Sequence, residues 1–371
     1  MSTHRSLILS GSIGQGHSSV AEVCAAAFER GGSQVTTIDC MADLGGTGRR
    51  IGEFVFRHTL SRPPIFDALH FSQLRTASRL SDRMERASAR RVTKALRECT
   101  PQPELMLGVF ATGAGAAGRI HQNTPQVRTA VLCTDATAHR IWMHPGVERY
   151  LVCSTMAAAT VRQYEPTADV VEIVPPVRPQ FFSVPDQRAA RASLELDEDR
   201  PLIVLMSGGW GVGAQAEVAR QLADEGYGVA AVAGSNASLA TRLRHQARQT
   251  SKGEIVAYGY TDRIPDLMAA ADVVVTTSGQ TCHEARVVRR PLVIMDAVAG
   301  HGRENLLLEI TKGGALASTP HPRSVVHAVQ AALEGVCPPA DPWPLSSPHQ
   351  WDEQFLASLE GLIPAKGGPP N

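Results

Sequence analysis

Residues 10–17, SGSIGQGH, place His17 at the end of a glycine-rich stretch that follows the apolar run SLILS. A glycine-rich turn after a strand lets backbone N–H groups approach a phosphate. A histidine there, with an unperturbed pKa near ~6.5, can take a proton from a hydroxyl at neutral pH. His17 is therefore a candidate general base, and the alternative is a residue that only caps the following helix.

A second candidate pair, Asp135 and His139, follows the apolar run AVLCT. The carboxylate can orient a histidine or bind hydroxyl groups, and the histidine can do the same. The alternative for this pair is that it only organises a loop.

The second half of the chain carries signals for a nucleotide. LMSGGWGVG at 205–213 follows another apolar run and suits a diphosphate, although such glycines also make ordinary turns. Glu284 lies early in a helix that follows a Ser-Gly turn. A carboxylate there can accept two hydrogen bonds from a ribose diol, or it can merely complement the helix dipole.

Short β-branched runs alternate with helical segments and would position these residues. The expected strands are SLILS, QVTTID, ELMLGVF, RTAVLCT, RYLVCS and VVEIV, followed by PLIVLMS, YGVAAVAG, EIVAYGY, DVVVTTS and PLVIMDA. Such nearly continuous apolar runs predict parallel strands covered on both faces, and therefore α/β domains. We expect two doubly wound, Rossmann-like domains facing a cleft, with ligands beyond the carboxyl ends of the strands.

The domain boundaries follow from composition. Residues 177–200 are rich in proline and charge and are expected to form a linker. The linker separates an N-terminal domain over 1–176 from a C-terminal domain over 201–336. Residues 337–371 are expected to form a crossing segment with a helix and a tail.

Residues 45–97 form a basic and apolar insert in the first half. Between 49 and 97 there are twelve Lys/Arg and four Asp/Glu, a net charge of +8. Basic charge beside apolar residues suits an anionic membrane surface. The alternative is a solvated helix whose arginines cover its own core.

Composition excludes several classes of protein. The formal net charge is zero, which gives no global electrostatic case for nucleic acid. The seven scattered cysteines show no metal-ligand spacing and suit small core residues in a reducing compartment. The N-terminus lacks the apolar stretch of a signal peptide, and no apolar run approaches the ~20 residues of a membrane span. A cytoplasmic enzyme is therefore expected.

Four stretches together resemble one family. SGSIGQGHSSVAE, TDATAHRIWMHPGVERYLVCS, VPPVRPQFF and TTSGQTCHEA with GHGREN are similar, in this order, to motifs of the GT-B glycosyltransferases. That group includes monogalactosyldiacylglycerol synthase, the processive diacylglycerol glucosyltransferases and, more distantly, the enzyme that adds N-acetylglucosamine to lipid I.

The resemblance implies roles at the matching positions. It makes His17 the base that faces the acceptor, Arg178 a linker arginine that reaches the donor diphosphate, and Glu284 the ribose-binding glutamate. The other donor positions are Gly208 and Gly209 in the diphosphate loop, Ser278, Gly279 and Gln280 in the Ser-Gly turn, and Gly300, His301 and Asn305 in a later loop. Where the family often has Gln-Glu, this chain has His301-Gly302, and the lead-in proline is Ala299. Because that pair commonly contacts sugar hydroxyls, the identity of the sugar stays open.

The function implied is transfer of a hexose from a nucleotide-sugar donor, expected to be a UDP-sugar, to a hydroxyl with inversion. A single displacement forms no glycosyl-enzyme, so no carboxylate pair is needed. Two alternatives are an isomerase like the UDP-GlcNAc 2-epimerases, which would need acid/base carboxylates around the sugar, and a non-catalytic nucleotide-sugar-binding protein.

The acceptor implied is a lipid such as diacylglycerol or a small metabolite, and the insert at 45–97 favours the lipid. Arg178, helix dipoles and backbone N–H groups are expected to balance the leaving charge, with no cofactor and no obligatory metal. If the insert binds anionic lipid, the cytoplasmic protein would also contact the inner face of a membrane peripherally.

Overall fold

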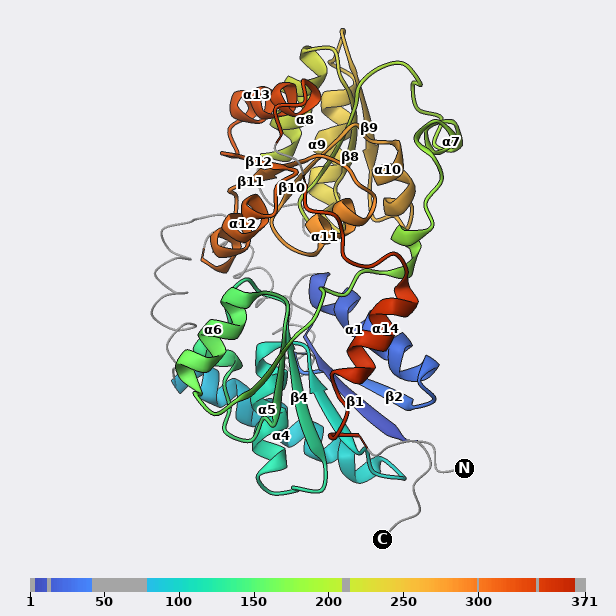
Figure 1. Ribbon diagram of the computed structural model, residues 1–371. Coiled ribbons are helices and arrows are strands. Elements are labelled where there is room, and N and C mark those ends of the chain that lie inside the picture. Colours follow the sequence, from blue (N-terminus) through green and yellow to red (C-terminus); the bar gives the residue numbers. More distant parts are fainter. Residues whose placement is uncertain are drawn as a thin grey trace.

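The computed structural model describes residues 4–11, 15–41, 79–208, 214–298, 300–337 and 340–363. Two parallel six-stranded sheets, one from each half of the chain, lie in separate α/β domains (Figure 1). The first sheet has the order β2-β1-β3-β4-β5-β6. Its strands are β1 (Arg5–Ser10), β2 (Gln34–Asp39), β3 (Leu105–Gly108), β4 (Arg128–Cys133), β5 (Arg149–Val152) and β6 (Asp169–Glu172).

The second sheet has the order β12-β11-β10-β7-β8-β9. Its strands are β7 (Leu202–Met206), β8 (Gly228–Val232), β9 (Glu254–Tyr258), β10 (Val273–Thr277), β11 (Leu292–Met295) and β12 (Ala315–Ser318). The strands expected from the sequence are all present, but β12 was not expected. Its sequence, ALAS, has little β propensity, and it forms a strand because it pairs with β11 at the edge of the sheet.

Helices cover both sheets. Those on the first are α1 (Gly16–Arg30), α4 (Arg79–Glu98), α5 (Ala111–His121), α6 (Thr155–Tyr164) and α14 (Pro348–Ala357), with the 3₁₀ turn η3 (Arg140–Trp142). The second half carries η4 (Pro179–Phe182), α7 (Gln187–Ser193), α8 (Gln215–Asp224), α9 (Ala237–Ala247), α10 (Ile264–Ala270), α11 (Gln280–Val287), α12 (His301–Thr311) and α13 (Pro322–Leu333). The expected α/β class is confirmed.

Each sheet has one point where the strand order reverses. In the first sheet this point lies between β1 and β3, and in the second between β7 and β10. Neighbouring loops there leave in opposite directions and open a crevice beyond the carboxyl ends of the strands. The glycine-rich stretches after β1 and β7 and the Ser-Gly turn after β10 all begin at these crevices.

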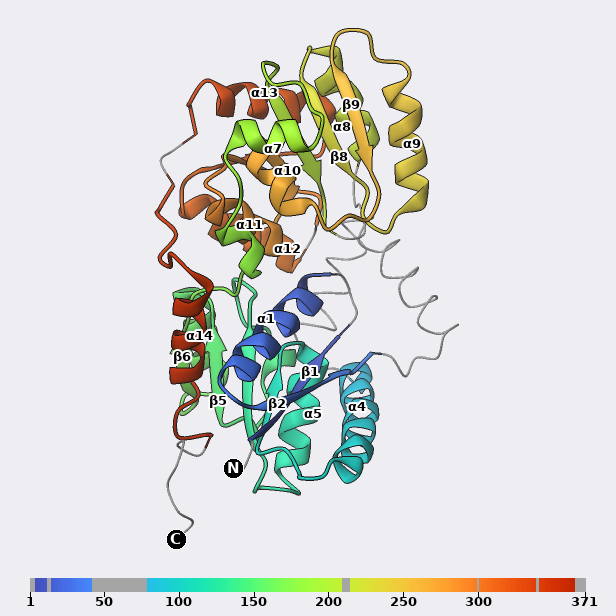
Figure 2. The same cartoon turned by 90° about the vertical axis from the view of Figure 1, so that its right-hand side faces the viewer.

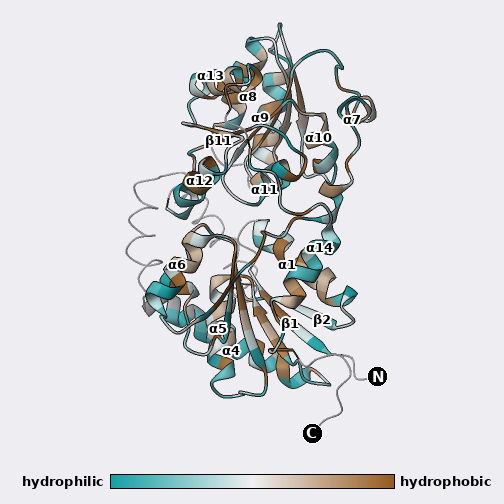
Figure 3. Ribbon diagram, viewed as in Figure 1, coloured by the Kyte–Doolittle hydropathy of each residue, from teal (hydrophilic) through white to brown (hydrophobic). Residues whose placement is uncertain are grey.

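One apolar face of helix α1 packs against the first sheet. The helix carries an apolar stripe that is buried, with Val20, Val23, Ala27 and Phe28 all at or below 5% exposure. The strands beneath are apolar along most of their length, whereas the outer faces of the helices are hydrophilic (Figure 3). Burial of this stripe orients α1 so that its first turn begins at the crevice beside β1.

The chain crosses between the domains a second time near its end. Helix α14 lies beside α1 on the first domain in both views (Figures 1 and 2). Asp352 on α14 receives two hydrogen bonds from the Arg30 guanidinium, at 2.6 and 2.8 Å, and Phe355 packs edge-on against Phe28. The C-terminal helix is therefore part of the N-terminal domain.

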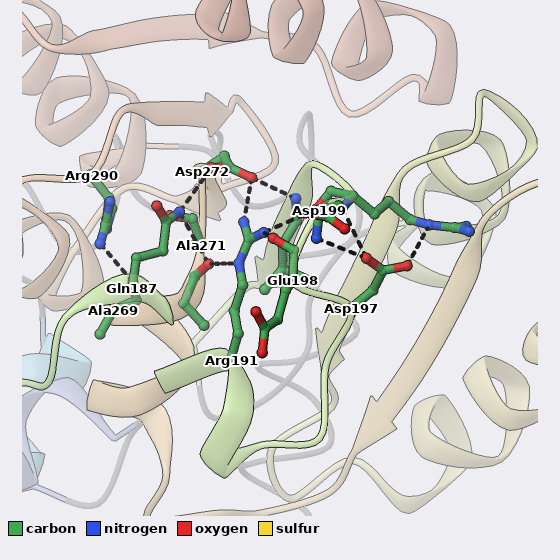
Figure 4. Close-up of polar contacts among 12 residues, drawn as sticks. Gln187, Arg191, Asp197, Glu198, Asp199, Ala269, Ala271, Asp272 and Arg290 are labelled. Atoms are coloured by element: carbon green, nitrogen blue, oxygen red, sulfur yellow. Dashed lines mark hydrogen bonds and ion pairs between the residues drawn. The ribbon is translucent and has the colours of Figure 1, made fainter. Parts of the chain in front are cut away.

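Helix α7 ties the linker to the second sheet at the end away from the crevice (Figure 4). Asp272, directly before β10, accepts hydrogen bonds from Arg191 at 2.6 Å and Gln187 at 2.8 Å. It also accepts one from the backbone N–H of Leu202, the first residue of β7, at 2.7 Å. One carboxylate thus joins the two strands whose other ends form the crevice.

An Asp-x-Asp sequence, Asp197-Glu198-Asp199, lies in the loop before β7 at this same end. Its Asp197 accepts hydrogen bonds from the backbone N–H groups of Asp199 at 2.9 Å and Arg200 at 3.0 Å. The Asp197 carboxylate therefore caps a turn. The Asp-x-Asp sequence lies at the end of the sheet opposite the crevice.

The basic insert is described only from residue 79 onward; the part over 45–78 lies outside the described residues. The arginine-rich end of the insert forms helix α4. Val92 and Leu96 are buried against the first domain. Exposed basic residues recur every three or four positions along the outer side: Arg83, Arg86, Arg90, Lys94 and Arg97.

Candidate functional site

A cavity of about 340 Å³ lies between the two domains where both crevices meet. Its lining combines the glycine-rich turn of the first domain with the Ser-Gly turn and the later loop of the second. The sequence-predicted residues that line it are His17, Asp135, Arg178, Gly208, Ser278, Gly279, Gln280, Glu284, His301 and Asn305. Predicted residues as far apart in the chain as His17 and Asn305 therefore share one site.

Three predicted positions do not line the cavity or cannot be placed. His139 is buried at 4% exposure behind the cavity wall. Gly300 is the N-cap of α12 and supports the lining indirectly. Gly209 lies outside the described residues.

His17 is held by two groups from the loop after β3. Its Nδ1 lies 3.0 Å from the carbonyl oxygen of Val109, and its ring packs edge-on against Phe110 with centroids 4.9 Å apart. Phe110 in turn requires Gly11, where a Cβ would lie 2.4 Å from the Phe110 ring. Within the described residues, the N-cap Gln15 makes no side-chain capping hydrogen bond and His17 bonds to Val109, so no contact there supports the helix-cap alternative for His17.

This geometry selects a tautomer of His17. A carbonyl oxygen can only accept, so the hydrogen bond to Val109 places the proton on Nδ1 and leaves a lone pair on Nε2. Burial lowers the pKa of His17 below its usual value of 6.5, although nearby Asp135 opposes the shift. His301 lowers the pKa further. The imidazole is therefore neutral at pH 7, the form that a proton acceptor needs.

Asp135 lies at the centre of the polar groups in the first domain. It accepts a hydrogen bond from the indole Nε1 of Trp142 at 3.3 Å. Burial alone would raise the pKa of Asp135, but His301, then His17 and His139, and a hydrogen bond with Asn305 lower it. The carboxylate therefore stays ionised between histidines from both domains.

Glu284 on α11 meets the linker. Its Oε1 accepts a hydrogen bond from Nε of Arg178 at 3.0 Å and lies 2.9 Å from a terminal nitrogen of the same guanidinium, as an ion pair. Glu284 is 4% exposed, and this burial raises its pKa against the opposing effect of Arg178. Both contacts use the same oxygen, and within the described part of the chain no hydrogen bond to Oε2 is present. Oε2 can therefore accept a hydroxyl from a ligand in the cavity.

Glycines shape the turns of the second domain that face the cavity. Gly208, Gly279 and Gly300 have φ values of 60°, 144° and 62°, which side chains rarely allow. Gly279 and Gly300 start α11 and α12, whose N-termini carry partial positive charge. Gly302 belongs to the His301-Gly302 pair that replaces the Gln-Glu common in the family. A larger residue would not fit at this position, because a Cβ there would lie 2.5 Å from Val298 Cγ1.

Sequence reasoning missed residues at the mouth of the cavity. Tyr260 and Thr261 follow β9 and line the cavity, and the Tyr260 ring is 73% exposed. Their position just beyond the carboxyl end of an expected strand was a usable signal, because that edge binds the ligands of such sheets. Thr134, at the end of β4, was missed in the same way.

The chain is similar to known proteins in both sequence and structure. Residues 17–172 match the family model of monogalactosyldiacylglycerol (MGDG) synthase. MurG from Acinetobacter baumannii has a similar structure, with a TM-score of 0.57 at 13% identity over 96% of this chain and all of that one. The chain has the GT-B fold. The GT-B assignment agrees with the two sheets, their switch points and the cavity between them.

Two relatives show the sequence likeness of this GT-B protein. Monogalactosyldiacylglycerol synthase of Spinacia oleracea is 27% identical over 337 residues, which cover 84% of this chain and 63% of that protein. A processive diacylglycerol beta-glucosyltransferase of Bacillus licheniformis is 26% identical over 211 residues, which cover 56% of this chain and 55% of that protein. The resemblance to these glycolipid glycosyltransferases is thus confirmed, although the GT-B protein spans less than two thirds of either.

Proposed function

We propose that this GT-B protein transfers a hexose from a UDP-sugar to a lipid hydroxyl, with inversion at the sugar carbon. The observation that carries the proposal is the shared cavity, in which a neutral His17 of one domain faces the Ser-Gly turn and Glu284 of the other. The likeness to glycolipid synthases supports a lipid acceptor.

The donor would lie against the second domain. Glu284 Oε2 would accept from the ribose hydroxyls, and the N-terminus of α11 with the Gly208 turn would hold the diphosphate. Tyr260 offers an exposed ring at the mouth for the base. Arg178 would reach the diphosphate only by releasing part of its contact with Glu284, so its role toward the donor remains a prediction.

The transfer step would run through His17. The acceptor oxygen forms a bond to the anomeric carbon from the face opposite the diphosphate, and the bond from that carbon to the leaving oxygen breaks. The hydroxyl proton moves to Nε2 of His17, and the electron pair leaves on UDP. Asp135 stabilises the imidazolium that results, because the two groups lie near each other. Helix N-termini would balance the leaving charge, so we propose that no metal is obligatory.

A transfer assay tests the function directly. The protein is incubated with labelled UDP-glucose, UDP-galactose or UDP-N-acetylglucosamine, with and without diacylglycerol in mixed micelles, and with EDTA in a parallel series. We expect labelled lipid from at least one donor and no loss of rate in EDTA. Epimerised donor without transfer would support the isomerase, and binding without turnover would support a non-catalytic protein.

The lipid acceptor also predicts contact with a membrane. No helix in the described part of the chain is long and apolar enough to span a bilayer. We propose that the protein instead binds peripherally, from the cytoplasm, through 45–97, with the basic side of α4 facing anionic headgroups. Vesicles with 30% phosphatidylglycerol, as a test composition, should sediment the protein, and salt should weaken this binding. Equal sedimentation with neutral vesicles would contradict the proposal.

A further inference from the structure

Helix α12 of the second domain reaches across the cavity to the loop at 134–139 of the first. The Asn305 side-chain oxygen accepts a hydrogen bond from the backbone N–H of Ala136 at 2.7 Å. One residue earlier, Glu304 Oε2 accepts a hydrogen bond from the Thr137 hydroxyl at 2.5 Å. The same oxygen lies 3.4 Å from Nε2 of His139.

The loop that receives these contacts is itself fixed to the first domain. Ser154 donates a hydrogen bond to the carbonyl oxygen of Ala136 at 2.9 Å, and Thr160 accepts one from the N–H of Ala138, also at 2.9 Å. Thr137 and His139 are both less than 10% exposed. Because the loop is held on both sides, a contact from α12 constrains the whole loop, including Asp135.

Helix α12 also carries donor-side groups. Gly300 starts the helix, and His301 lines the cavity close enough to Asp135 to lower its pKa. The spacing between Asp135 and His301 therefore depends on how α12 sits against the loop. Glu304 is the residue of α12 that meets two side chains of the loop at once.

We propose that Glu304 is a positioning residue that latches α12 to the loop at 134–139 and so sets Asp135 and His17 against the donor. Glu304 does not line the cavity, so it acts through Thr137 and His139 and not by touching substrate. The expected effect of Glu304 on turnover rests on the proposed function. Loss of the latch would let the domains separate while each domain kept its own half of the site.

The test is a double-mutant cycle with Glu304→Ala and Thr137→Val. Glu353→Ala, which removes an exposed carboxylate on α14, is the matched control. We expect Glu304→Ala to lower turnover by about 10- to 100-fold, the scale of a misplacement of about 1 Å, with UDP affinity changed less than about threefold. Thr137→Val should cause a smaller loss, because Glu304 keeps its contact with His139. The double variant should be no worse than Glu304→Ala, because Glu304→Ala already removes the contact with Thr137.

Hydrogen exchange gives a readout that does not depend on transfer. The Ala136 N–H is protected by Asn305 only while the domains are joined, so the peptide over 134–139 should exchange faster in Glu304→Ala than in wild type, both with UDP bound. Peptides from α5 should not change. If wild type transfers no sugar, the proposed function fails, yet this comparison still tests the latch.

Three results would overturn the latch. Turnover losses that multiply in the double variant would mean that Glu304 and Thr137 act separately. A loss of UDP affinity as large as the loss of turnover would make Glu304 part of the donor pocket. Unchanged exchange over 134–139 would show that the contact does not hold the domains together.

Discussion

Two arginine–carboxylate pairs lie at opposite ends of the second sheet and differ in how fully they are bonded. At the end away from the cavity, Arg191 bonds to Asp272 and to three carbonyl oxygens, and Asp272 also accepts from Gln187 and Leu202. At the cavity, Arg178 meets Glu284 through one carboxylate oxygen. A guanidinium and a carboxylate form both pairs. In the first pair both carboxylate oxygens accept hydrogen bonds from the protein, whereas in the second only one oxygen does so within the residues that the structure describes.

The difference separates polar groups that only stabilise the sheet from a carboxylate that keeps one oxygen for the proposed ligand. Buried polar groups with every partner present hold a fold in place, whereas an unmet acceptor in a cavity costs stability unless a ligand satisfies it. The saturated pair joins β7 and β10 at their starts, so the other ends of those strands keep a fixed spacing. The positive-φ glycine turns and Glu284 lie at those other ends.

The largest effect should come from His17 at the cavity. We expect His17→Ala to lower turnover by about 10²- to 10⁴-fold, the usual contribution of a positioned base, while UDP affinity and thermal stability stay near wild type. Because the pKa of His17 is lowered, the wild-type rate should be level above pH 6.5 and fall only at more acidic pH, as the imidazole gains a proton.

Turnover and melting temperature should be measured on one preparation of His17→Ala. A folded variant with near wild-type turnover would remove His17 as the base and move attention to Asp135.

At the opposite end, Arg191→Met should destabilise the fold by about 3 kcal/mol, because it removes the charged partner of Asp272 and a donor to three carbonyl oxygens. Arg188→Met on the same helix is the control, since that side chain is 85% exposed and its ion pair should contribute less than about 1 kcal/mol. Urea unfolding measures both changes. If Arg191→Met instead weakened UDP binding in the folded protein without loss of stability, the contrast between the two ends would be wrong.

Glu284→Gln should weaken UDP binding by about 1–3 kcal/mol, the range for a hydrogen bond to a charged group. Stability should change little or rise, since a buried charge is removed, although Arg178 then loses its ionic partner. Calorimetry with UDP measures the affinity, and Glu217→Gln, an exposed carboxylate on α8, is the control. Unchanged affinity would take Glu284 out of the donor site.

The smallest effect should be a change in pH dependence on removing Arg178. Burial raises the pKa of Glu284, and Arg178 opposes it, so Arg178→Gln should raise that pKa further. Ionised Glu284 is the stronger acceptor for ribose, so UDP affinity falls as pH drops through this pKa, and the fall should begin at higher pH in the variant. UDP dissociation constants from pH 5 to 8 should differ by about tenfold at the acid end. If Arg178→Gln weakened UDP binding equally at every pH, the result would instead support direct contact between Arg178 and the diphosphate.

The sequence predicted the fold well because its signals are local. Continuous apolar runs located the expected strands, because burial on both faces leaves a pattern within each run. The glycine-rich turns were recognisable because their glycines directly follow apolar runs. By contrast, β12 has almost no signal of its own, and α12 meets the loop at 134–139 through residues about 170 positions apart, so no local pattern reports the contact.

The site shows the same division at the level of single residues. Residue type and position after a strand were enough to place His17, Asp135 and Glu284 at crevices of the two sheets. They could not show that His139 lies behind the cavity wall, or that Arg178 meets Glu284. The approach of the two domains brings these groups together, so only the tertiary structure sets their distances.

What the sequence determined by itself is every described strand except β12 and the chemical groups that follow those strands, because apolar patterning and backbone preference act over a few residues. What only the tertiary structure decided is the tautomer of His17, the open oxygen of Glu284 and the contact of Glu304 with the first domain. Each of these depends on a partner supplied by a distant segment, at a distance that close packing fixes and sequence spacing does not.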